Sequence, residues 1–253
     1  MWVFRIRGDF QSLDPWLPEL FDRGARGVEE REGEVLAYFP DRVELPLPGE
    51  WEKLPDEDWL AAWKRDLKPV AAGRFWVGAP WHEPEPGLVP VVIEPGMAFG
   101  TGHHETTRLA LSALSREVRP GMRVLDLGTG SGVLAIAAAK LGARAVAVDT
   151  DPVAVTAARA NAARNRVEVE VLEGSLEAVR GPFDLVVANL YAELHQALAP
   201  GYREALAPGG RLLATGVLAE RAAATRRALE AAGLAHRSEE REGEWVLMTL
   251  ERP

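Results

Sequence analysis

Residues 124–132 have the sequence VLDLGTGSG, in which an apolar stretch runs into a loop with glycine at every second position. A short apolar run ended by glycines predicts a buried strand and a turn, and the alanine-rich residues 133–140 predict a helix directly after it. Glycine lets the backbone approach a ligand closely, and the free N–H groups at a helix start attract carboxylates and other anions. The stretch therefore predicts a strand, loop and helix that together hold a small molecule.

Apolar runs and alanine-rich runs continue to alternate toward the C-terminus. The expected strands are 124–127, 145–148, 167–172, 185–188 and 212–215, and the expected helices are 133–140, 153–165, 192–206 and 220–232. Such alternation predicts a mostly parallel sheet with helices on both faces. Residues 237–241 and 244–250, around Glu242-Gly243, predict a closing antiparallel hairpin. The expected class is α/β, Rossmann-like.

A smaller module precedes this sheet. Residues 1–55 predict a small α+β, ferredoxin-like domain whose expected elements are strand 2–7, helix 14–22, and strands 27–31 and 35–39. Prolines and acids accumulate from Asp41 to Asp58, which predicts a linker, and Asp58 is a suitable N-cap for a linker helix over 56–72. We expect Trp51, Trp59 and Trp63 to pack between the two modules.

The second domain is expected over 73–253. It begins with two expected strands, 74–77 and 89–93, and continues with a polar, glycine-broken stretch over 94–107.

Composition narrows the functions that this chain can have. The first sixty residues hold seven Lys and Arg against fifteen Asp and Glu, out of a net charge of −9 for the chain. An acidic module favours a cationic partner and disfavours nucleic acid, although a solvated, solubilising face is an equal alternative. No apolar run approaches about 18 residues and no signal peptide is evident, so we expect a cytoplasmic protein without membrane contact. The absence of cysteine excludes thiolate catalysis.

Polar residues stand where the expected strands end. The loop has the spacing G-x-G-x-G, unlike the G-x-G-x-x-G of dinucleotide folds, and Asp126 before it would repel a pyrophosphate but tolerate an ammonium or sulfonium ligand. Asp149 ends the second strand about 20 residues downstream, where a carboxylate accepts both hydroxyls of a ribose. The alternative for Asp149 is a helix N-cap.

Two further strand ends complete the expected site. The third strand ends near Ser175, where an adenine edge would lie. The fourth ends at Asn189, whose amide oxygen, together with nearby backbone carbonyls, would hold an acceptor nitrogen; an Asx turn is the alternative.

Several of these stretches together resemble one family. Residues 95–102 (PGMAFGTG), His104, Thr106-Thr107, the 126–132 loop and Asn189-Leu190-Tyr191-Ala192 are similar to the ribosomal protein L-eleven methyltransferases (PrmA type), which have the class I S-adenosylmethionine (AdoMet) methyltransferase fold. At positions 94, 103 and 105 the chain has Glu, His and Glu where the family usually has Asp, Thr and Pro.

The resemblance implies roles for particular residues. AdoMet would contact Thr107, Gly128, Asp149 and Asn189, with residues 99–102 as a lid beside it. The full set of expected cofactor-binding residues is Thr107, Gly128, Gly130, Asp149, Ser175, Asn189, Phe99, Gly100 and Asp126, and the expected catalytic residues are Asn189 and Leu190. The N-terminal module would bind a basic ribosomal protein, whose α-amine and certain lysines are methylated.

Alternatives remain open at this point. The chain could methylate a small-molecule amine, a glutamine or a nucleic acid base, or it could be a nucleotide-dependent oxidoreductase or a non-catalytic nucleotide-binding protein. His103, His104 and Glu105 could suggest a metal, but we expect a hydrogen-bonded structural pair and no metal. We expect His195 at the surface, and a monomer.

Overall fold

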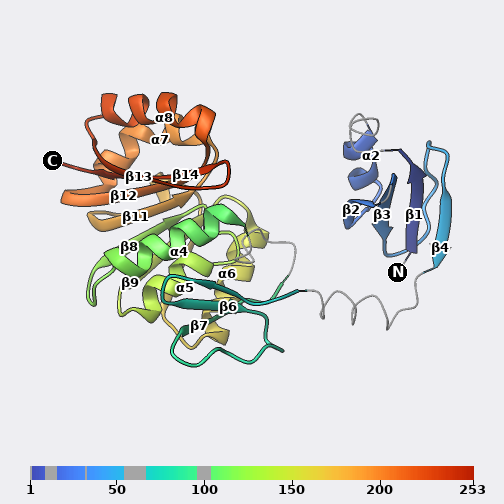
Figure 1. Ribbon diagram of the computed structural model, residues 1–253, viewed down its shortest axis with the longest axis horizontal. Coiled ribbons are helices and arrows are strands. Elements are labelled where there is room, and N and C mark those ends of the chain that lie inside the picture. Colours follow the sequence, from blue (N-terminus) through green and yellow to red (C-terminus); the bar gives the residue numbers. More distant parts are fainter. Residues whose placement is uncertain (1, 9–15, 32, 54–66, 96–103) are drawn as a thin grey trace. The chain divides into compact units, whose positions relative to one another are not determined.

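The computed structural model of this chain describes residues 2–8, 16–31, 33–53, 67–95 and 104–253. The chain divides into two compact units, Met1–Lys68 and Pro69–Pro253 (Figure 1). The expected positions of Trp59 and Trp63, and most of the expected linker helix, lie outside the described residues.

The first unit is a four-stranded antiparallel sheet with one helix. Its elements are β1 (Trp2–Arg7), α2 (Leu17–Asp22), β2 (Gly27–Arg31), β3 (Glu34–Phe39) and β4 (Glu50–Lys53). The strand order is β2-β3-β1-β4, so β3 lies between β1 and the strand that follows α2. This is the split β-α-β arrangement of ferredoxin-like folds, with a loop over 40–49 instead of a second helix. The expected small α+β fold is confirmed.

Strand β4 corrects two expectations. Residues 50–53 were expected within a linker, but they pair with β1. Trp51 was expected between the modules, yet its ring lies 4.9 Å from that of Phe4 and 5.1 Å from that of Phe39, in the core of the first unit. Because Trp51 is the single apolar residue in this strand, no alternation marked it in the sequence.

The second unit is built on a seven-stranded sheet. Its elements are β8 (Arg123–Leu127), α5 (Val133–Lys140), β9 (Arg144–Asp149), α6 (Pro152–Arg164), β10 (Val169–Glu173), β11 (Phe183–Asn189), α7 (Ala192–Ala205), β12 (Leu206–Leu218), α8 (Ala219–Ala231), β13 (Ala235–Glu242) and β14 (Trp245–Glu251). The order is β10-β9-β8-β11-β12-β14-β13, in which the first five strands are parallel and β14 and β13 form an antiparallel hairpin. The predicted sheet and closing hairpin are confirmed.

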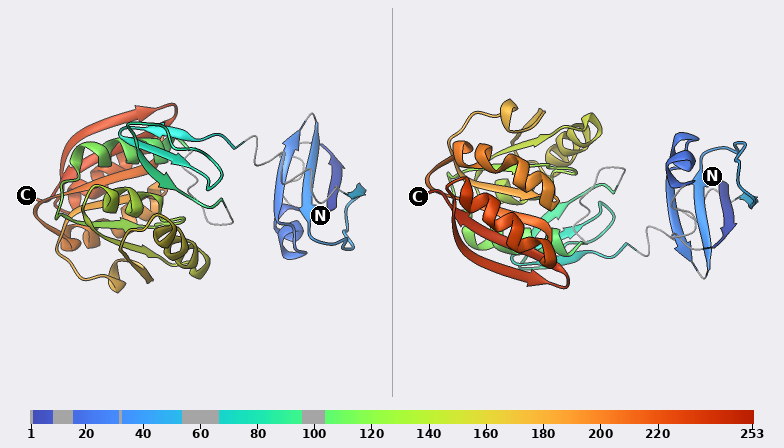
Figure 2. Two further views of the ribbon diagram at one scale, coloured as in Figure 1. Left: turned by 90° about the horizontal axis from the view of Figure 1, so that it is seen from below. Right: turned by 90° about the horizontal axis from the view of Figure 1, so that it is seen from above.

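Helices cover both faces of this sheet (Figures 1 and 2). Side chains of β11 alternate between two cores: Leu185 and Val187 pack with α5 residues on one face, whereas Val186 and Ala188 pack with α7 and α8 residues on the other. Burial on both faces explains why the strands of this sheet are nearly continuous apolar runs. The carboxyl ends of the strands therefore form one edge that remains available to a ligand.

A small second sheet and one further helix cover the face that carries α5. The elements are β5 (Val70–Ala72), β6 (Phe75–Gly78), β7 (Val89–Val92) and α4 (Glu105–Glu117). Leu111 and Leu114 of α4 share a core with Phe75 and Val77. The expected helix over 56–72 is wrong at Val70–Ala72, which pair with β6. Helix α4 was not predicted. Among the described residues, none of the helices combines the length and apolar character needed to cross a bilayer.

Candidate active site

The strand order places the ends of β8 and β11 at a special position. The direction in which the chain adds strands reverses between β8 and β11. Strands β9 and β10 follow outward from β8 on one side, whereas β12 follows outward from β11 on the other. Ligands of open α/β sheets bind in the crevice at such a switch point, outside the carboxyl ends of the strands. The register aligns these ends: Leu127 with Val148 and Ala188, Asp149 with Glu173, and Asn189 with Thr215.

A cavity of about 330 Å³ opens at this edge. It is lined by most of the predicted site residues, namely Thr107, Gly128, Gly130, Asp149, Ser175, Asn189 and Leu190. Apolar walls come from Leu127, Val133, Leu134, Leu194 and Leu198. The volume and the mainly apolar walls with a few convergent polar groups are typical of small-molecule sites.

The glycine loop gives the cavity its shape. Gly128, Gly130 and Gly132 all have left-handed backbones, with φ of 73°, 54° and 86°. A Cβ atom on Gly128 would lie 2.5 Å from Cδ2 of Leu190, so any larger residue would push that side chain. Glycine at position 128 thus satisfies both the backbone conformation and the space beside the cavity.

The Asp149 carboxylate is fixed by backbone donors from both sides. One oxygen accepts from the Gly130 N–H at 2.9 Å and the other from the Asp151 N–H at 3.0 Å. Each carboxylate oxygen can accept two hydrogen bonds, which leaves one lone pair on each for a ligand. The alternative role as helix N-cap is excluded, because Asp151 caps α6 by accepting from the Val153 N–H at 2.8 Å.

Asp126 requires a correction to its expected role. Its side chain is fully buried and does not line the cavity. One carboxylate oxygen accepts from the Thr129 hydroxyl at 2.6 Å and the Ala135 N–H at 3.0 Å, and the other has no hydrogen-bond partner among the residues that the structure describes. Burial raises the pKa of Asp126 to about 6. The carboxylate therefore braces the glycine loop against α5 from below and does not contact a ligand directly.

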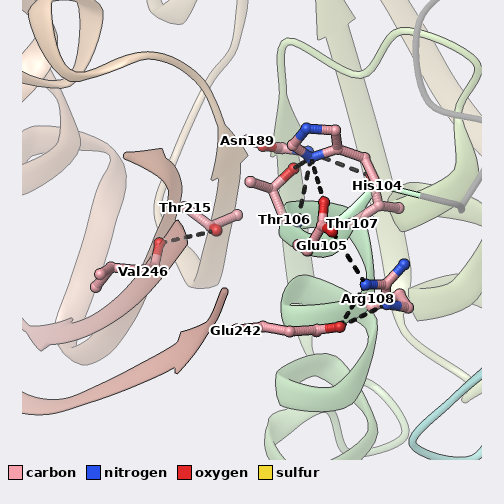
Figure 3. Close-up of polar contacts among 9 residues, drawn as sticks. All are labelled: His104, Glu105, Thr106, Thr107, Arg108, Asn189, Thr215, Glu242 and Val246. Carbon is pink, nitrogen blue, oxygen red and sulfur yellow. Dashed lines mark hydrogen bonds and ion pairs between the residues drawn. The ribbon is translucent and has the colours of Figure 1, made fainter. Parts of the chain in front are cut away.

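Asn189 meets the first turn of α4 (Figure 3). Its Nδ2 donates a long hydrogen bond of 3.5 Å to the buried Thr107 hydroxyl. His104 begins this helix, and its Nδ1 accepts from the Thr106 N–H at 3.3 Å. Farther along, Arg108 pairs with Glu242 of β13. His104 therefore caps α4, while the expected pairing with His103 lies outside the described residues. The Arg108–Glu242 pair ties α4 to the closing hairpin.

His195 was expected at the surface, and that expectation is wrong. The side chain is fully buried, with Nδ1 3.0 Å from the Tyr202 hydroxyl and Nε2 2.9 Å from the Thr215 carbonyl oxygen. Thr215 and the following Gly216 contact the Asn189-Leu190 segment and were missed by the sequence analysis. Gly216 has a positive φ of 84°. A single glycine after an expected strand is common, so the sequence did not indicate this conformation.

Part of the expected site lies outside the described residues, namely Phe99, Gly100 and His103. Glu94, which precedes that stretch, forms an ion pair of 2.8 Å with Arg164, and its N–H donates to Asn161 Oδ1 at 3.0 Å. Asn161 Nδ2 donates in turn to the Ser131 carbonyl at 2.9 Å. Within the ranges that the structure covers, no group of three or more His, Asp or Glu side chains could hold a metal.

Comparison with known proteins decides the family. The family model described as "Ribosomal protein L11 methyltransferase (PrmA)" matches residues 35–253. The chain belongs to the PrmA family. A ribosomal protein L11 methyltransferase of Thermus thermophilus is 63% identical over the full length of both chains. That of Deinococcus radiodurans is 45% identical over all of this chain and 99% of its own.

A solved structure agrees with the PrmA assignment. The ribosomal protein L11 methylase of Lactobacillus delbrueckii subsp. bulgaricus superposes with a TM-score of 0.68 and 32% identity, covering 73% of this chain and 98% of the other. This PrmA family member is therefore an AdoMet-dependent methyltransferase with a class I, Rossmann-like catalytic fold.

Proposed function

We propose that this enzyme transfers methyl groups from AdoMet to the α-amine and to lysine ε-amines of ribosomal protein L11. The observation that carries the proposal is that Asn189, at the end of β11, and Asp149, at the end of β9, line the same cavity. Asn189 supplies an amide that can hold the amine that accepts the methyl group, and Asp149 supplies a carboxylate that can bind the ribose of AdoMet. The substrate follows from the relatives, which are named as methyltransferases of that protein.

The described residues fit AdoMet. The free lone pairs of Asp149 suit the two ribose hydroxyls, and Gly128 and Gly130 keep the loop backbone close to the ligand. Ser175, at the end of the next strand, suits the adenine edge, and Thr107 lies beside Asn189. We assign Phe99 and Gly100 to a lid over the same ligand on the resemblance alone. Asp126 acts indirectly, through the loop.

The chemistry needs a neutral amine aligned with the methyl group. When bound, AdoMet would supply a methyl group on a sulfonium: the lone pair of the neutral amine would bond to the methyl carbon, in line with the carbon–sulfur bond that breaks, and the thioether S-adenosylhomocysteine would leave. A lysine of pKa about 10.4 requires about 4 to 5 kcal/mol to lose its proton at pH 7. The apolar walls around Leu190 disfavour the charged ammonium, and its proton can leave to water. Asn189 Oδ1 then accepts a hydrogen bond from the amine and orients its lone pair, with the Leu190 backbone beside it. Positioning is the main contribution of the protein.

The first unit is our candidate for substrate binding. Residues 1–68 hold ten Lys and Arg against sixteen Asp and Glu, a formal charge of −6, which attracts a basic ribosomal protein and repels RNA. We place the reaction in the cytoplasm, on a monomeric enzyme without direct contact to nucleic acid. Removing residues 1–68 should abolish methylation of the protein and preserve AdoMet binding. Loss of both would assign the first unit a structural role only.

The substrate is tested by methyl transfer in vitro. Purified enzyme and methyl-labelled AdoMet are incubated separately with ribosomal protein L11, ribosomal RNA and free lysine. We expect label in the protein alone, on its α-amine and on lysines. Label in the RNA, or in free lysine at a similar rate, would contradict the proposal and favour one of the alternative substrates.

The role of Asn189 is tested by separating binding from chemistry. Asn189→Ala should lower the single-turnover rate of methyl transfer by about 100-fold, because the amine is no longer aligned. The Kd for AdoMet should stay within about twofold of the wild-type value. Equal losses in rate and affinity would contradict a role in aligning the amine.

A further inference from the structure

One buried histidine lies directly behind the proposed acceptor segment, Asn189-Leu190. His195 is on the first turns of α7, and its ring nitrogens contact the Tyr202 hydroxyl and the Thr215 carbonyl. A carbonyl oxygen only accepts hydrogen bonds, so Nε2 carries the hydrogen and Nδ1 accepts from the tyrosine hydroxyl. Burial lowers the pKa of His195 to about 4, which keeps the ring neutral at physiological pH. The imidazole is thus a fixed donor to Thr215.

The Thr215 carbonyl is shared between the histidine and the acceptor segment. It also accepts the Leu190 N–H, at 3.0 Å. On its other side, the Thr215 hydroxyl donates to the Val246 carbonyl at 3.0 Å (Figure 3). One residue of β12 therefore connects α7, β14 and the residue that directly follows Asn189.

The backbone of β12 is irregular at this point. Its pairing with β14 shifts register between Ala214 and Val217, so the regular ladder is interrupted over Thr215-Gly216. Bulges of this kind occur next to active sites, where they redirect side chains. Ladder bonds to β14 are interrupted at these two residues, and on that side the Thr215 hydroxyl bonds to Val246 instead. On the other side Thr215 pairs with Asn189 of β11, and His195 adds a hydrogen bond to the Thr215 carbonyl.

Gly216 links the bulge in β12 to Asn189 Oδ1, the oxygen that we propose binds the amine. A Cβ atom at this position would lie 2.5 Å from the Leu190 carbonyl oxygen and 2.9 Å from Asn189 Oδ1. Such distances are shorter than van der Waals contact, so a side chain at this position would collide with both oxygens. A displacement of the bulge toward the Asn189-Leu190 segment would therefore push on Asn189 Oδ1.

We propose that His195 is a positioning residue for methyl transfer: its hydrogen bond to Thr215 fixes the bulge at 215–216 and thereby the location of Asn189 Oδ1. This inference rests on the proposed role of Asn189 in aligning an amine. His195 does not line the cavity and contacts no substrate, so it acts through Thr215 and Gly216 and through its interaction with the Leu190 backbone.

The test uses the full-length chain and two variants of the histidine. His195→Leu removes the hydrogen bond to Thr215, and His195→Gln restores a donor and an acceptor of similar reach. The single-turnover rate with ribosomal protein L11 should fall by about 10- to 100-fold in His195→Leu and return to within about threefold of wild type in His195→Gln. The Kd for AdoMet, measured by calorimetry, should change by less than about twofold in both variants.

Two glycine variants test the role of the bulge even if His195→Leu does not fold. Gly216→Ala places a Cβ against both oxygens and should reduce the rate by a similar factor. Gly121→Ala is its matched control, since Gly121 has nearly the same φ (85° against 84°) but nothing within 4 Å of an added Cβ. We expect this control to retain the wild-type rate.

Each result has a defined meaning. A wild-type rate in His195→Leu would overturn the positioning role, as would a Gly216→Ala rate equal to that of Gly121→Ala. Parallel losses of rate and AdoMet affinity in His195→Leu would show a structural role only. Failure of the wild-type enzyme to label the ribosomal protein would instead contradict the proposed function, so the two ideas fail separately.

Discussion

Replacing His195 by glutamine should remove most of one pH-dependent contribution to stability. The ordinary pKa of histidine is 6.5, and burial lowers that of His195 to about 4. Between these values the unfolded chain binds one more proton than the folded chain does, so the free energy of unfolding falls as the pH drops through this window. Below about pH 4 both states are protonated, and this contribution becomes constant.

The pKa difference sets the magnitude. At about 1.4 kcal/mol per pKa unit, the fall from 6.5 to about 4 corresponds to about 3 kcal/mol. Asp126 acts in the opposite sense, because its pKa is higher in the folded state, about 6 against 3.8. The contributions of Asp126 and His195 to the free energy of unfolding therefore largely cancel, so the pH dependence of the wild type alone does not reveal that of His195. The difference between wild type and His195→Gln isolates it, since the other groups cancel.

Urea unfolding followed by far-UV circular dichroism at pH 7, 6, 5 and 4 measures this difference. Relative to His195→Gln, the wild type should lose about 3 kcal/mol between pH 7 and pH 4. Tyr202→Phe is the matched control: it removes the hydroxyl partner but leaves the imidazole buried, so it should keep the wild-type pH dependence. Parallel curves for wild type and His195→Gln would contradict the lowered pKa of His195 in the folded chain.

Three further variants test the site in other ways. Asp126→Asn should abolish a fall of about 3 kcal/mol in the free energy of unfolding as the pH rises from 4 to 6, and an unchanged slope in urea unfolding would contradict this. Gly128→Ala should raise the AdoMet Kd about tenfold in calorimetry, because its Cβ displaces Leu190 and its φ is positive. Gly121→Ala should leave the Kd unchanged, and equal Kd values for the two variants would contradict a role of Gly128 in AdoMet binding. Asn161→Ala should destabilise the fold by about 2 kcal/mol in urea unfolding by leaving its backbone partners unpaired, and a loss below about 0.5 kcal/mol would contradict that.

Much of the catalytic fold could be predicted because its signals are local. Each parallel strand is a short apolar run closed by a polar or glycine residue, so Gly128, Asp149 and Asn189 were found at strand ends before the strand order was known. Ligands of open α/β sheets bind outside the carboxyl ends of the strands, so these three residues were expected to line one site.

The features that were missed depend on contacts between distant residues. Strand β4 has one apolar side chain, Trp51, and becomes a strand only by pairing with β1. His195 resembles a surface residue of α7 in the sequence, but in the fold it is buried and its ring is paired with the Thr215 carbonyl, 20 residues downstream beside a bulge. Asp126 could have been placed correctly, since strand alternation directs it away from Leu127, which does line the cavity.

The most direct test of the account is calorimetric titration of AdoMet into Asp149→Ala, with Asn189→Ala measured alongside. Loss of two charge-assisted hydrogen bonds to the ribose should weaken the affinity of Asp149→Ala by about 100-fold, whereas Asn189→Ala should bind nearly as wild type does. Wild-type affinity in a correctly folded Asp149→Ala would contradict the claim that the carboxyl edge of the sheet, at Gly128 and Asp149, is where the methyl donor binds.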